Sequence, residues 1–159
     1  MVRLSLAGIF VLMSAACTSV AEEPSSPAPD PLPPEAETTL HDDLLTLDAH
    51  LDTPALFHRA GYDFSRRGSY QTDRTNVDLP RLQEGQLDGG FWVIYTAPGP
   101  LNEAAYIAAR TSAILRQASI REMAAKYADS VALAFEADDA ARIHEAGKIV
   151  VFQSMENAY

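Results

Sequence analysis

The chain has 159 residues, a formal net charge of −10 and 47% hydrophobic residues. This acidity argues against a nucleic-acid-binding role, because contacts to phosphates need clustered Lys and Arg side chains. The chain has a single cysteine, which rules out an internal disulfide, so a packed core or a bound metal has to stabilise the fold.

Residues 1–16 have the pattern of an export signal. Arg3 precedes a mostly apolar stretch of about ten residues, which is too short to span a bilayer. Small residues at 14–16 then precede Cys17, an arrangement that resembles a bacterial lipoprotein signal, in which the cysteine is lipidated. A second small-residue site at 19–21 leaves ordinary secretion open. We expect export to the bacterial cell envelope, with Cys17 anchoring the protein to a membrane that faces the periplasm or the exterior.

Residues 17–43 are predicted to form a tether. Six of the ten prolines lie between residues 22 and 40. Proline fixes φ and lacks a backbone donor, so this segment is expected to be extended and semi-rigid. The same composition also fits a leader with no task of its own. The folded domain is expected over residues 44–159.

From residue 44 onward, the pattern alternates between strand and helix. Four apolar runs, rich in β-branched or aromatic residues, are predicted strands: 44–49, 90–96, 130–135 and 148–156. Helical spacing or capping residues predict three helices: 78–85, 102–127 and 138–147. Residues 53–77 are predicted to be a long polar loop. The alternation predicts right-handed βαβ units and a parallel α/β sheet.

Polar side chains end two of the predicted strands. His50 and Asp52 end the first strand one pleat apart, so their side chains are expected on one face, and Glu156 ends the fourth. In parallel α/β folds, active sites gather at the C-terminal ends of strands. One imidazole and two carboxylates suit Zn²⁺, although they could also hold Mn²⁺ or Co²⁺. An isolated His-x-Asp is more often incidental, and Glu156 could instead pair with a basic side chain.

Four stretches, in this order and spacing, resemble the membrane dipeptidases, also called renal dipeptidases or peptidase family M19. These are binuclear zinc enzymes of the amidohydrolase superfamily with a (β/α)₈ barrel. The stretches are residues 47–54, 75–85, 87–96 and 147–157. The resemblance implies the N-terminal half of a (β/α)₈ TIM-type barrel. It also implies that His50 and Asp52 bind one zinc and that Glu156 bridges two zinc ions.

The implied activity is metal-assisted hydrolysis of dipeptides, of the EC 3.4.13 type, including dipeptides with a D-residue at the C-terminal side. In the family, two further histidines complete the second metal site and a later aspartate handles protons. These residues are expected beyond residue 159, so no catalytic acid or base is assigned within the chain. We therefore expect residues 44–159 to be an incomplete barrel and this truncated chain to be inactive.

Two other functions remain open. An exported lipoprotein could keep the start of the barrel as a non-catalytic binding module. Another amidohydrolase, such as a lactonase or a deaminase, would share the His-x-Asp, but such relatives usually bridge their metals with a carbamylated Lys. The expected partners are a dipeptide substrate and, through Cys17, a membrane, with oligomerisation left open. His41, His58 and His144 are expected to face solvent or to hydrogen-bond locally rather than to bind metal.

Overall fold

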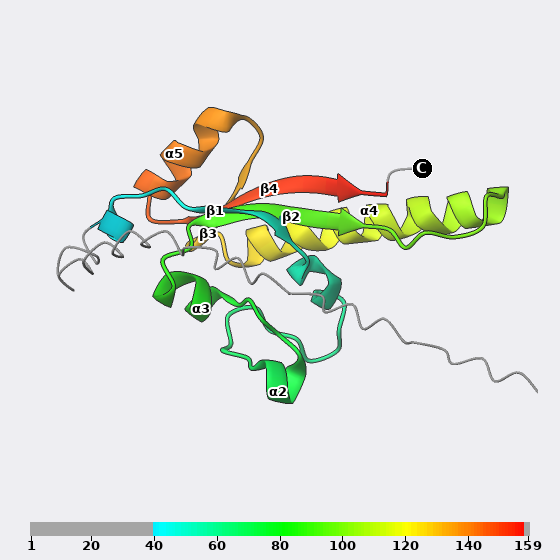
Figure 1. The fold of residues 1–159 in the computed structure, drawn as a ribbon, viewed down its shortest axis with the longest axis horizontal. Helices are drawn as coiled ribbons and strands as arrows, with labels where there is room; N and C mark the ends of the chain where they lie inside the picture. The colour runs from blue at the N-terminus through cyan, green and yellow to red at the C-terminus, as the bar shows by residue number, and fades with distance from the viewer. Residues whose placement is uncertain (1–39, 158–159) are drawn as a thin grey trace, which may run out of the picture. The chain divides into compact units, whose positions relative to one another are not determined.

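The structure is a computed structural model that describes residues 40–157. The predicted export signal, Cys17 and most of the predicted tether lie outside the described residues. Four parallel strands form one sheet in the order β1-β2-β4-β3 (Figure 1). They are β1 (Leu47–Leu51), β2 (Gly89–Tyr95), β3 (Val131–Ala134) and β4 (Ile149–Glu156). The predicted parallel α/β sheet is confirmed, and it is consistent with part of a TIM-type barrel.

Two helices cover opposite faces of this sheet (Figure 1). On one face, α4 (Glu103–Lys126) contributes Ile120 and Met123 to a core that includes Trp92. On the other face, α5 (Ala137–Glu145) packs Ile143 against Val150. The chain runs outward from β2 to β3 through α4 and returns to β4 through α5, so two crossovers of the same hand place their helices on opposite faces. No helix in residues 40–157 is both long and apolar enough to cross a membrane.

The strand order determines how far apart the ends of β1 and β4 lie. Residues 89–95 of β2 pair with residues 150–156 of β4, whereas β3 pairs only with residues 149–152. β3 pairs only with β4 and therefore lies at the outer edge of the sheet. β1 and β4 are therefore only two strand spacings apart, about 10 Å. This separation is short enough for side chains to bridge.

The first strand lies further along the chain than the sequence predicts. It begins at Leu47 and ends at Leu51, whereas the prediction was 44–49. Leu44 and Leu45 are exposed, so their apolar side chains add no core face to the strand. The Thr46 backbone N–H donates to the Asp88 carboxylate at 2.7 Å instead of to a neighbouring strand. Apolar sequence alone therefore placed the start of the strand wrongly.

The long segment between β1 and β2 has more regular structure than the predicted loop. It contains η1 (Thr53–Leu56) and α2 (Tyr70–Asp73) before the predicted helix, which is α3 (Leu79–Glu84). Asp78 caps α3 as expected, because its side chain accepts the backbone N–H of Arg81 at 3.0 Å. The side chain of Asp78 is also buried and accepts from the Arg81 guanidinium at 2.8 Å. This cap anchors the segment just before it returns to the sheet.

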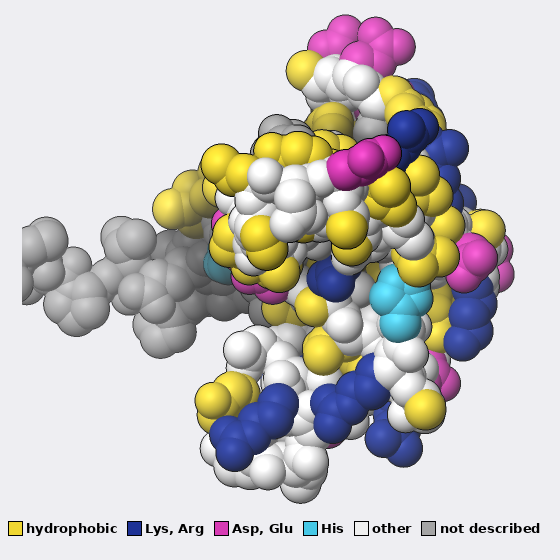
Figure 2. Space-filling view, turned by 90° about the vertical axis from the view of Figure 1, so that its right-hand side faces the viewer, with side chains coloured by type: hydrophobic (Ala, Val, Ile, Leu, Met, Phe, Trp, Pro, Cys, Tyr) yellow, Lys and Arg dark blue, Asp and Glu magenta, His cyan; other side chains and the backbone are white. Residues whose placement is uncertain are grey.

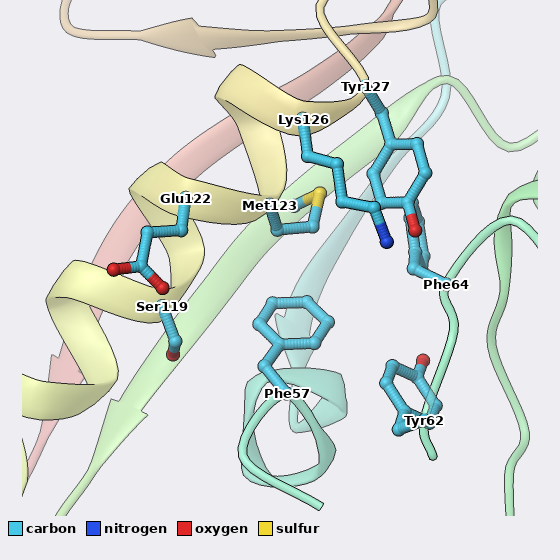
Figure 3. A pocket seen from close by; sticks show the side chains of 8 residues that line it. All are labelled: Phe57, Tyr62, Phe64, Ser119, Glu122, Met123, Lys126 and Tyr127. Carbon is cyan, nitrogen blue, oxygen red and sulfur yellow. The ribbon is translucent and has the colours of Figure 1, made fainter. Parts of the chain in front are cut away.

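Aromatic side chains pack this segment against α4. The Phe64 ring lies edge-on to Trp92 with 5.5 Å between ring centroids, and Phe57 stacks on Trp92 at 6.0 Å. Figure 3 shows Phe57 facing Met123 of α4, and Phe64 beside Tyr127, whose ring centroids are 5.8 Å apart. These residues and Tyr62 line a pocket of about 150 Å³. These contacts hold the segment that follows β1 against the face of the sheet that α4 covers.

Candidate metal centre

β1 contains a bulge just before its predicted metal ligands. Its pairing with β2 steps from Asp48↔Gly90 to Leu51↔Trp92, so β1 uses one more residue than β2 over this stretch. The Asp48 carboxylate accepts the backbone N–H of His50 at 2.7 Å, which gives this amide a partner where the ladder is interrupted. Bulges re-aim side chains, and His50 lies within this irregular stretch.

His50, Asp52 and Glu156 lie together at the C-terminal ends of β1 and β4. The Nε2 atom of His50 is 3.4 Å from Oδ1 of Asp52 and 3.3 Å from Oε2 of Glu156. One candidate ligand atom from each residue lies within 4.8 Å of the other two. Asp52 follows the last residue of β1 and precedes η1. The structure therefore brings together the three side chains that the sequence analysis singled out.

These three side chains are accessible from solvent. The exposed fractions are 51% for His50, 72% for Asp52 and 42% for Glu156. Figure 2 views the molecule from the end toward which the strand arrows of Figure 1 point. Acidic, basic and histidine side chains all reach this face, and Lys and Arg gather on its lower part. Solvent and small solutes can therefore reach the cluster.

A clamp between the ends of β2 and β4 fixes the backbone next to Glu156. The Thr96 hydroxyl donates to the Asn157 carbonyl at 2.6 Å, and the Asn157 side-chain amide donates to the Thr96 carbonyl at 3.2 Å. The Thr96 backbone N–H donates to the Glu156 carbonyl at 3.3 Å. Asn157 has a φ of 59°, a left-handed conformation that asparagine tolerates better than most residues. The clamp therefore restrains the position of the Glu156 Cα atom, from which the side chain extends.

The donor set fits a divalent cation. Metal–ligand distances of about 2.0–2.2 Å at a tetrahedral angle separate two donor atoms by about 3.3–3.6 Å. The two distances from His50 to the carboxylate oxygens, 3.4 Å and 3.3 Å, match this separation. Two carboxylates supply anionic ligand oxygens, which suit a divalent cation. Imidazole with carboxylate ligands suits zinc, manganese or cobalt.

The other described histidines lie outside this cluster. His58 is exposed, and the Nε2 atom of His41 is 3.3 Å from the Gln86 carbonyl. The Nδ1 atom of His144 is 3.0 Å from the Asp88 carboxylate, a partner 56 residues away rather than a local one. Within residues 40–157, no second group of His, Cys, Asp and Glu side chains converges closely enough to hold a metal.

A pocket of about 430 Å³ borders the cluster. His50 and Asp52 line it together with Arg74 and Asn76 from the segment between β1 and β2. The remaining lining residues are Asp48, Leu51, Thr53, Ala55, Leu56 and Val77. The sequence analysis did not identify Arg74 or Asn76, because neither belongs to a ligand-spacing pattern. The aromatic pocket of Figure 3 is lined by none of the three candidate ligands.

Ionised carboxylates stabilise the segment that borders this pocket. Hydrogen bonds from the hydroxyls of Ser65 and Tyr127 lower the pKa of Asp63 to about 2. A hydrogen bond from the Thr75 hydroxyl lowers the pKa of Asp73. Burial raises the pKa of the Tyr62 hydroxyl, with the charge of Asp78 adding to the effect. The carboxylates of Asp63 and Asp73 therefore remain charged hydrogen-bond acceptors at neutral pH.

A family model described as membrane dipeptidase (peptidase family M19) matches residues 35–159, which is most of the chain. Among curated proteins, no sequence matches the chain.

Solved structures share the fold, and they include the following three. The probable dipeptidase PvdM from Pseudomonas aeruginosa has a TM-score of 0.68 at 23% identity, over 79% of this chain and 31% of that one. Dipeptidase AC, a metallopeptidase of family M19, has a TM-score of 0.57 at 22% identity, over 71% and 37% of the two chains. A metallopeptidase from Rhodobacter sphaeroides, liganded with a phosphinate mimic of the dipeptide L-Ala-D-Ala, has a TM-score of 0.58 at 21% identity, over 72% and 38%. The matches cover about a third of the length of these solved relatives.

Proposed function

The chain belongs to the membrane dipeptidase family (peptidase family M19), and from this premise we propose that it forms part of a metal-dependent hydrolase of dipeptides. The observation that carries the proposal is the convergence of His50, Asp52 and Glu156 at the C-terminal ends of the strands. Catalytic residues of (β/α)₈ barrels lie at this end of the strands. Because the chain spans about a third of its solved relatives, the proposed activity is that of the whole protein.

We assign one metal ion, zinc, to His50, Asp52 and Glu156. Glu156 would also contact a second ion, whose remaining ligands the described residues do not supply. When bound, the metal supplies Lewis acidity toward the peptide carbonyl and lowers the pKa of water towards neutrality. This chemistry is what a dipeptidase needs to cleave an unactivated amide.

The residues of this chain bind and orient, and none is assigned a proton-transfer step. His50 offers the Nε2 lone pair, and the two carboxylates offer charged acceptor oxygens. The bulge and the Asp48 carboxylate fix the backbone of His50, while the Thr96–Asn157 clamp fixes the backbone of Glu156. Ligands held in this way need less reorganisation when the metal and the substrate bind.

The choice of test substrate follows from the relatives. One solved relative is liganded with a mimic of L-Ala-D-Ala, which supports trying both L,L- and L,D-dipeptides. The family match favours a dipeptidase over a lactonase or a deaminase. We also propose export and lipidation at Cys17, on the strength of the sequence pattern at residues 1–17 alone.

The test is hydrolysis by the protein expressed from its complete open reading frame. Purified protein is treated with a chelator and then supplied with zinc, manganese or cobalt, and the release of alanine from L-Ala-L-Ala and L-Ala-D-Ala is measured. We expect hydrolysis that the chelator abolishes and one of the metals restores. If no dipeptide is hydrolysed with any of these metals, the proposal is wrong and a non-catalytic binding module becomes the better account.

A further inference from the structure

Among residues 40–157, Arg74 is the only Lys or Arg that lines the pocket beside the candidate metal ligands. The other charged side chains that line it, Asp48 and Asp52, are acidic. A bound substrate that extends from the metal site into this pocket would therefore meet one fixed positive charge among negative ones. Such a charge influences which side chains the pocket accepts, because it attracts an anion into a lining that also holds the carboxylates of Asp48 and Asp52.

The Arg74 guanidinium is held in place without being neutralised. Its Cζ atom lies 4.8 Å from the centroid of the Tyr70 ring, a cation–π contact that orients the group and leaves its charge intact. Arg74 forms no ion pair with any carboxylate of residues 40–157. Its donors thus remain available for a ligand carboxylate, which arginine binds with a matching planar fork.

The backbone at Arg74 is strained and is held by its neighbours. Its φ of 62° and ψ of 28° lie in the left-handed region, which is unfavourable for residues other than glycine. On one side, the Asp73 carbonyl accepts from the Arg59 guanidinium at 2.6 Å. On the other side, the buried Thr75 accepts at its carbonyl from Arg81 at 3.1 Å. Strain that the surroundings enforce in this way often marks a binding site.

The walls of the pocket suit a short aliphatic chain that ends in a carboxylate. Ala55 and Val77 offer small apolar surfaces, and Asn76 can add an amide donor near Arg74. We propose that Arg74 makes the protein selective for dipeptides with an acidic side chain, aspartate or glutamate. This inference rests on the proposed dipeptidase function and specifies its substrate class.

The experiment compares matched acidic and neutral substrates in the protein from the complete reading frame. The pairs are Glu-Ala with Gln-Ala and Ala-Glu with Ala-Gln, which differ only in side-chain charge. We measure the ratio of kcat/KM within each pair for the unsubstituted protein and for R74Q, R74K and the control R66Q. Arg66 is an exposed arginine of the same segment that does not line this pocket.

We expect the unsubstituted protein to prefer the acidic member of at least one pair. R74Q should lower that preference about 10-fold or more, because a charge-assisted hydrogen bond is lost. R74K should restore part of the preference, and R66Q should leave it unchanged. A purely structural effect of R74Q would lower both members of a pair equally, and an unchanged ratio would overturn the inference.

Two other outcomes are informative. A C-terminally amidated dipeptide, Ala-Ala-NH₂, is compared with Ala-Ala in the same variants. If R74Q changes only this second ratio, Arg74 recognises the main-chain carboxylate and the side-chain assignment is wrong. If the unsubstituted protein hydrolyses none of these dipeptides, the proposed function itself fails. Hydrolysis with unchanged ratios would reject the selectivity alone.

Discussion

Two histidine–carboxylate clusters occupy opposite ends of the same sheet. At the C-terminal ends, the His50 imidazole faces the carboxylates of Asp52 and Glu156. At the N-terminal ends, His144 faces Asp88, whose other oxygen accepts from the backbone N–H of Thr46 at 2.7 Å and from its hydroxyl at 3.0 Å. Each cluster contains a histidine and at least one carboxylate, but the hydrogen-bond partners of the carboxylates differ.

Saturation by protein hydrogen-bond donors separates a structural carboxylate from a candidate metal ligand. Asp88 uses both of its oxygens to join α5, the start of β1 and the start of β2, and only 20% of its side chain is exposed. Within residues 40–157, Asp52 and Glu156 have no comparable set of backbone donors, and they are more exposed. The N-terminal cluster of Asp88 and His144 should therefore contribute stability, and the C-terminal cluster of His50, Asp52 and Glu156 should bind a cation.

Substituting the C-terminal cluster should have the largest effect. We expect His50→Ala or Glu156→Gln to lower dipeptide hydrolysis about 1000-fold or more, because the several kcal/mol of metal assistance is lost. The free energy of unfolding of the metal-free protein, measured with urea, should change by less than about 0.5 kcal/mol, since these side chains are exposed. Hydrolysis that survives either substitution would place the reaction elsewhere.

The N-terminal cluster should show the opposite behaviour. Asp88→Ala leaves the half-buried Thr46 N–H and the His144 imidazole without their shared acceptor, and we expect a loss of about 1–3 kcal/mol in the free energy of unfolding. Metal affinity should be unchanged. The matched control is Asp42→Ala, an exposed aspartate near the same end of the sheet. If Asp88→Ala weakens metal binding, the separation of a structural cluster from a metal-binding cluster is wrong.

Loosening the clamp beside Glu156 should give an intermediate effect. Thr96→Val keeps the shape of the buried side chain but removes the donor to the Asn157 carbonyl, so we expect a cost of about 1 kcal/mol. Metal affinity should also fall several-fold, because the backbone of one ligand gains freedom. Thr111→Val on the exposed surface of α4 is the control. Unchanged affinity in Thr96→Val would show that Glu156 is positioned by other contacts.

The smallest expected effect is a response to acid in the segment between β1 and β2. The pKa of Asp63 falls from 3.8 to about 2 on folding, so its contribution is complete above about pH 4 and is lost as the pH falls towards 2. Tyr127→Phe removes one donor to Asp63, which should move this loss to higher pH. Tryptophan fluorescence can follow it, because Phe64 of the segment packs on Trp92. If the unsubstituted protein and Tyr127→Phe respond identically to acid, the Tyr127 hydroxyl does not stabilise the Asp63 carboxylate.

Local sequence patterns predicted most of the strands and the longer helices. The features that the sequence did not predict depend on contacts between residues that are far apart in the chain. The Asp78 cap and the Glu156 strand end follow from neighbouring residues and are confirmed. The place of β3 at the outer edge follows from its pairing with β4 and not with β2, which the local sequence does not indicate. The Asp88–His144 contact joins residues 56 positions apart, and Arg74 lines the pocket from a left-handed backbone conformation that no local pattern indicated.

The central claim is that His50, Asp52 and Glu156 bind a divalent cation. Calorimetric titration of zinc into metal-free protein from the complete reading frame tests it most directly, with His50→Ala and His144→Ala as the paired variants. We predict saturable binding that His144→Ala preserves and His50→Ala weakens at least about 100-fold. Equal zinc affinity in the unsubstituted protein and in His50→Ala would contradict the claim.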